Sequence, residues 1–81
     1  MRIIKEIPHP NYRTTLFHWN NKYIIKLETP WLEQTFKIDQ YEFTSDEEAL
    51  QILDEEFMTL AMKRFEQMSL DFAEAMKRAQ S

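Results

Sequence analysis

The stretch LFHWNNKYIIKL, residues 16–27, decides the fold of the first half of the chain. Asn20-Asn21 is flanked by two runs rich in aromatic and β-branched residues, which favour β-strands. A two-residue hairpin turn of type I′ needs positive φ at both central positions, and after glycine asparagine tolerates this best. Because the chain contains no glycine, the asparagine pair predicts a tight hairpin between strands at 12–19 and 22–28.

Two more strands are expected, one on each side of this hairpin, at residues 2–7 and 31–38. A two-residue loop at 20–21 pairs Leu16 with Ile25, and a two-residue loop at 29–30 would pair Leu27 with Leu32. Both registers place the same apolar set on one face, as a core face requires. The first forty residues therefore predict an antiparallel meander.

Residues 46–80 contain neither glycine nor proline, and their apolar residues recur every three or four positions. This is the period of an α-helix. Thr44 and Glu47 have the spacing of a capping box at its start, and so do Ser45 and Glu48. The only N-cap pattern inside the segment is Ser69 followed by Asp71, so any kink or break is expected near Ser69. Because the apolar period keeps its phase there, we expect a continuous or mildly kinked helix.

The expected fold is α+β, with a four-stranded antiparallel β-meander packed against a long C-terminal α-helix. We expect one domain over residues 1–81, with a β-sheet half at 1–40 and a helical half at 41–81. The first half carries six Lys/Arg and four Asp/Glu, whereas the second carries four and ten, which gives the net charge of −4. The negative charge is thus concentrated in the helical half.

The composition excludes several classes of site. Without cysteine there is no disulfide, thiolate metal site or thiol nucleophile, and the absence of such staples favours the cytoplasm. Without glycine there is no Walker or dinucleotide-binding loop. The two histidines have no helical partner at metal-binding spacing, and no apolar run approaches a membrane span. We therefore expect a non-enzymatic protein with no catalytic residue, cofactor, metal ion or membrane partner.

The length of the predicted helix implies a partner. Thirty-five helical residues would span about 50 Å, whereas a seven-residue strand spans about 23 Å. Either the helix breaks and folds back, or it stays whole and buries its surplus apolar surface against a second copy or another protein. We favour a homodimer, with an interface formed by Leu60, Met62, Phe65, Phe72 and Met76.

The second face of the predicted sheet is the other candidate surface. Alternation along the strands places aromatic, apolar and basic side chains there: Arg13, Phe17, Trp19, Lys22, Ile24 and Lys26. This face would be a small second core if the first strand, the 8–11 loop or the 39–44 linker covers it. Left uncovered, it would serve as a protein interface, or bind single-stranded nucleic acid or a flat aromatic ligand. The acidic total disfavours nucleic acid, because it repels a polyanion.

The alternation of side chains along a strand also places neighbouring residues of the stretch 16–27 on opposite faces of the predicted sheet. His18 is expected on the core side opposite Tyr23, where a hydrogen-bonded structural histidine fits better than a ligand. Trp19 is expected on the opposite face, beside Lys22.

Overall fold

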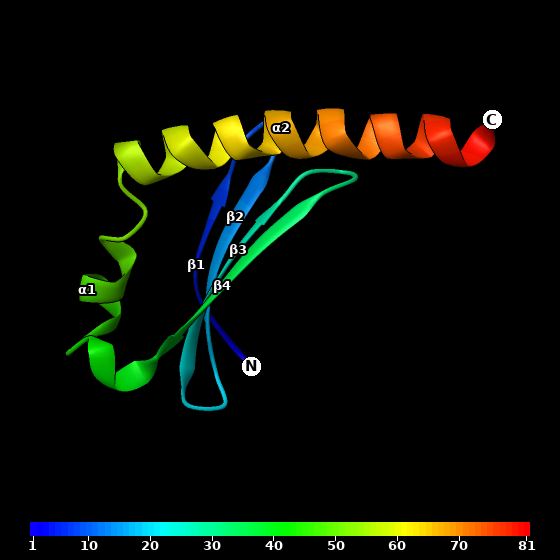
Figure 1. Ribbon diagram of the computed structural model, residues 1–81. Coiled ribbons are helices and arrows are strands. Elements are labelled where there is room, and N and C mark those ends of the chain that lie inside the picture. Colours follow the sequence, from blue (N-terminus) through cyan, green and yellow to red (C-terminus); the bar gives the residue numbers. More distant parts are fainter.

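The structure, a computed structural model, describes residues 1–81 and has the predicted α+β architecture. One antiparallel sheet in the order β1-β2-β3-β4 lies against two helices that both occupy one side of it (Figure 1). The elements are β1 (Arg2–Pro8), β2 (Arg13–Trp19), β3 (Lys22–Glu28), β4 (Glu33–Asp39), the 3-10 helix η1 (Gln40–Glu42), α1 (Asp46–Leu50) and α2 (Glu55–Gln80).

The β2–β3 hairpin confirms the predicted turn. Asn20 and Asn21 have φ values of 53° and 62°, the left-handed conformation that a type I′ turn requires. The register pairs Leu16 with Ile25 and Trp19 with Lys22, as the two-residue loop predicts. The local chemistry of two asparagines is therefore enough to set the register of the central strand pair.

The predicted register between β3 and β4 is wrong by two residues. Glu28 pairs with Glu33 and Leu27 with Gln34, so the loop comprises the four residues 29–32 and leaves Leu32 outside the strand. The side chain of Thr29 stabilises this longer loop, because its hydroxyl accepts hydrogen bonds from the backbone N–H groups of Trp31 and Leu32. A shift of two preserves the alternation of side chains, so the same set still faces the core.

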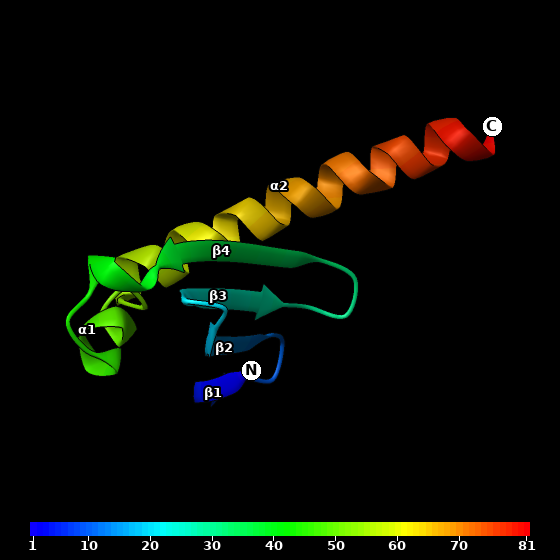
Figure 2. The ribbon, with the colours of Figure 1, turned by 90° about the horizontal axis from the view of Figure 1, so that it is seen from below.

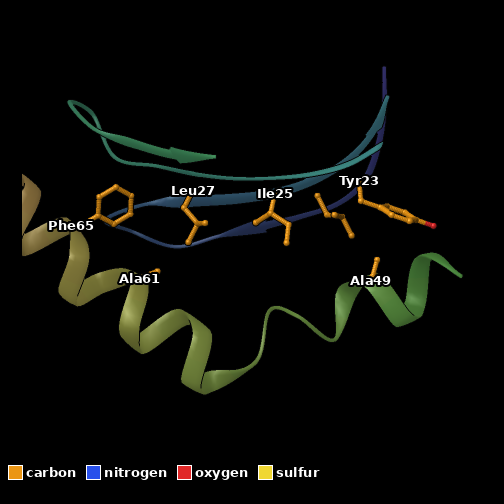
Figure 3. Close-up of a cluster of buried hydrophobic side chains, with 7 residues drawn as sticks. Tyr23, Ile25, Leu27, Ala49, Ala61 and Phe65 are labelled. Carbon is orange, nitrogen blue, oxygen red and sulfur yellow. The ribbon is translucent and has the colours of Figure 1, made fainter. Parts of the chain in front are cut away.

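The core lies between one face of the sheet and the two helices (Figure 3). Tyr23, Ile25 and Leu27 on β3 point toward the helices, together with Leu16 on β2. From the other side, α1 contributes Ala49, and α2 contributes Ala61 and Phe65. The alanines permit close approach of each helix to the sheet, since a larger side chain at either position would hold the helix away.

The helical half contains a break between residues 50 and 55, and the prediction that any break would lie near Ser69 is wrong. α1 ends at Leu50 and α2 begins at Glu55, whereas α2 continues through Ser69 without interruption. Asp54 caps the new helix, because its carboxylate accepts a hydrogen bond of 2.8 Å from the Phe57 N–H. The break turns the chain so that Ala49 and Ala61 can both reach the curved sheet.

The start of α1 confirms the predicted capping by Ser45, whose hydroxyl accepts a hydrogen bond of 3.1 Å from the Glu48 N–H. The Glu48 carboxylate in turn accepts hydrogen bonds from the backbone N–H and the hydroxyl of Thr44. Ser45 thus satisfies one of the free N–H groups at this end of the helix, and Glu48 ties the preceding residues to it.

Candidate interaction surfaces

The C-terminal half of α2 extends past the sheet (Figures 1 and 2). A helix of 26 residues spans about 39 Å, and a seven-residue strand only about 23 Å. The face of α2 that buries Ala61 and Phe65 continues at the helical period to Phe72 and Met76. These two side chains are 53% and 43% exposed, because the sheet ends before it reaches them.

The β3–β4 loop provides the second wall of a groove beneath this overhang. The loop, residues 29–32, packs Leu32 against the core and leaves Trp31 86% exposed. Together the loop and the face of α2 from Phe65 to Met76 enclose a hollow of about 1050 Å³, which we call the apolar groove. Glu66, which is exposed, is its one charged lining residue. The groove therefore suits an apolar segment with a polar edge.

The expected dimer interface is divided by the fold into three parts. Phe65 is buried in the core of the single chain, and Met62 packs against that core. Leu60 is exposed but is not among the residues that line the apolar groove. Phe72 and Met76 are exposed as well and are the two exposed members of the predicted set that line the groove.

Two residues of this surface are not among the predicted interface residues. Trp31 falls within the strand predicted at 31–38, but it belongs to the loop and lines the groove. Leu70, 61% exposed, lies on the flank of the helical stripe and also lines the groove. Thr29-Pro30 is the signal that could have found Trp31, since a four-residue loop that begins at Thr29 places Trp31 outside the strand.

The second face of the sheet carries no covering helix (Figure 1). As predicted, the register places Phe17 beside Ile24, and Trp19 beside Lys22. Trp19 is 50% exposed, whereas Ile24 is only 7% exposed. A shallow hollow of about 650 Å³ lies over these side chains, with Lys26 and Lys37 at its edge. We call this surface the open sheet face.

The positive charge of the open sheet face is largely balanced by neighbouring carboxylates. Arg13 lies 3.3 Å from Glu6, and Lys26 lies 3.3 Å from Glu33. The ammonium of Lys26 also lies 5.9 Å from the centroid of the Phe17 ring, within the range of a cation–π contact. Lys22 makes no ion pair. The face is therefore much less basic than its lysines and arginines alone suggest.

The sheet and α1 are joined by a polar cluster on the core side. The Asp46 carboxylate accepts hydrogen bonds of 3.1 Å from the Arg2 guanidinium and 3.0 Å from the Tyr23 hydroxyl. These bonds, that from Arg2 above all, hold the pKa of Asp46 below its ordinary value of 3.8. Burial, and secondarily the hydrogen bond to Asp46, raises the pKa of Tyr23. The cluster thus holds the carboxylate charged and the phenol protonated, as a structural contact between β1, β3 and α1 requires.

His18 also has a structural role, as predicted. Its ring forms a hydrogen bond of 2.8 Å with the Gln40 side-chain oxygen, and it lies edge-on to Tyr23 at a centroid distance of 5.3 Å. Nowhere do three side chains of the metal-ligating types gather. The polar clusters of the molecule therefore connect elements of the fold.

Comparison with family models, with curated proteins and with solved structures finds no match to this chain. Neither α2 nor any other helix has both the length and the apolar composition needed to cross a bilayer. The two surfaces of the molecule that could bind a partner or ligand are the apolar groove and the open sheet face.

Proposed function

We propose that the protein is a non-enzymatic cytoplasmic interaction module that forms a homodimer through the C-terminal half of α2. The observation that carries this proposal is the continuation of the core-facing stripe of α2 beyond the sheet, where Phe72 and Met76 have no covering layer. Trp31 and Leu70 bring further exposed apolar surface to the same groove.

The size of this surface supports a partner. Trp31 is 86% and Phe72 53% exposed. With about 150–250 Å² for a whole aromatic side chain, the two expose roughly 200–350 Å². The largest apolar patch of a typical monomer is about 300–600 Å² and is often functional. Adding Leu70 and Met76 brings the groove into the size range of the largest apolar patch on a typical monomer, and patches of this size are often functional.

The oligomeric state tests the proposal. We expect sedimentation equilibrium at micromolar concentration to give twice the 9.9 kDa chain mass. Phe72→Glu should shift the protein to monomer without changing its circular dichroism, because a buried unpaired carboxylate opposes association. Tyr41→Glu is the matched control, since Tyr41 is 85% exposed and does not line the groove. A wild-type chain that stays monomeric at the highest soluble concentration would remove the homodimer.

A second candidate function is the binding of single-stranded nucleic acid or a flat aromatic ligand on the open sheet face. Its support is the half-exposed Trp19 beside a shallow hollow, with the Phe17 ring and the Lys37 ammonium in the same lining. Stacking on aromatic side chains is tolerant of base identity, and lysines can meet phosphates. The net charge of −4 and the paired state of Lys26 oppose it.

Fluorescence distinguishes this second function from the first. The chain has two tryptophans, so Trp31→Phe leaves Trp19 as the sole reporter. Binding predicts quenching of Trp19 by an oligothymidylate at low salt and loss of that quenching as salt rises. The reciprocal variant Trp19→Phe, with Trp31 as reporter, is the control and should not respond. An unchanged Trp19 spectrum at low salt would end the nucleic-acid candidate.

A further inference from the structure

Charged groups of opposite sign lie on one flank of α2. Glu66 lines the apolar groove, and Lys77, which is not among the lining residues, follows eleven residues later, about three helical turns along α2. Both side chains therefore project from the same side of the helix, roughly 16 Å apart. Both are exposed, and neither takes part in an ion pair of the chain. The flank is acidic toward the middle of α2 and basic toward its C-terminal end.

The groove-lining residues of α2 between Glu66 and Lys77 leave room for a second helix. Ser69 and Ala73 are four residues apart and stand on one face of α2, where both line the groove. Their small side chains permit a second helix to approach closely, since interaxial distance depends on the side chains at the contact. Phe72 and Met76 stand beside them and supply the larger apolar groups.

We propose that the groove is occupied by α2 of a second copy of the chain, running antiparallel, so that Glu66 of each copy faces the partner's Lys77. The proposal rests on the proposed homodimer and specifies its geometry. In a two-fold contact residue i meets j and j meets i, so the antiparallel arrangement forms the Glu66–Lys77 pair twice. A parallel arrangement would instead place Glu66 beside the partner's Glu66, which is destabilising.

Trp31 completes the contact. The β3–β4 loop lies against the same groove, so a second helix placed there packs against the indole, which the single chain leaves 86% exposed. Large aromatic side chains near the centre of an interface contribute most to binding energy. Each copy therefore supplies one helix and one tryptophan to a symmetric interface.

Disulfide cross-linking tests the direction of the helices, since the natural chain has no cysteine. Glu66→Cys and Lys77→Cys are prepared separately, then oxidised alone and as a mixture. The antiparallel contact predicts a disulfide dimer in the mixture and little in either variant alone. The matched control is Glu56→Cys mixed with Gln67→Cys, which has the same spacing on a flank outside the groove and should not cross-link.

The outcomes separate the geometry from the homodimer itself. Cross-linking of each variant with itself, without a heterodisulfide between positions 66 and 77 in the mixture, would overturn the antiparallel arrangement while the homodimer stands. A wild-type chain that is monomeric by sedimentation would remove both. A dimer in which neither the mixture nor the single variants cross-link would overturn the α2–α2 contact and leave another surface as the interface.

Charge reversal provides an independent measurement with the natural packing retained. Glu66→Lys and Lys77→Glu should each raise the dimer Kd by roughly tenfold, because two attractive pairs become repulsive. The double variant exchanges the charges and should restore the Kd to about the wild-type value. Glu56→Lys is the control outside the groove. Additive losses in the double variant would contradict the proposed pairing.

Discussion

Leu27→Ala should strongly destabilise the domain, because Leu27 is fully buried at the centre of the core. The change removes three carbon groups at about 0.8 kcal/mol each, or about 2.4 kcal/mol of transfer free energy. A residual cavity of about 50 Å³ would add about 1.2 kcal/mol. The expected loss in the free energy of unfolding is therefore about 3.5 kcal/mol, out of roughly 4–12 kcal/mol for a domain of this length.

Leu60→Ala is the matched control, since the same atoms are removed from a side chain that is 45% exposed. We expect a change within about 0.5 kcal/mol there. Urea titrations of both variants and the wild type, at one fixed protein concentration, measure the difference with any dimerisation held constant. Equal losses at the two positions would refute the assignment of Leu27 to the core and of Leu60 to the surface.

Three further predictions concern polar groups and the hairpin turn. The Thr14 hydroxyl is buried without a hydrogen-bond partner, so Thr14→Val should leave the free energy of unfolding unchanged or raise it by about 1 kcal/mol, measured by urea titration. Because the pKa of Asp46 is held below 3.8, its carboxylate stabilises the fold at neutral pH and loses this effect as pH falls through the lowered folded value. Asp46→Asn should therefore be less stable than wild type at neutral pH, and the gap should close in acid; a constant gap in thermal melts across that range would contradict this. Asn21→Ala should cost about 1–2 kcal/mol, since asparagine tolerates the φ of 62° at this position through local hydrogen bonds of its side chain and alanine does not, whereas Asn21→Gly should cost nothing in the same melts.

The assignment of side chains to the core face and to the opposite face of the sheet could be predicted from the sequence, because it depends on local rules. Alternation along a strand has a period of two, so the shift of the β3–β4 register from a two-residue to a four-residue loop left every side chain of β4 on its predicted face. The N-cap at Ser45 has the same local character. The break at residues 51–54 does not, because no glycine or proline marks it and Asp54 competes with many other acidic residues as a cap.

The sequence by itself determined the hairpin at Asn20-Asn21, the apolar face of the sheet and the absence of glycine- and cysteine-dependent sites. These follow from backbone φ preferences and residue chemistry, which act over a few residues. Only the tertiary structure decided which part of the α2 stripe is core and which is groove. Phe65 and Phe72 are the same residue type on the same helical face, but the sheet ends between them. The position of the end of the sheet relative to α2 depends on both the length of the β3–β4 loop and the place of the helix break. No local sequence pattern predicts the two together.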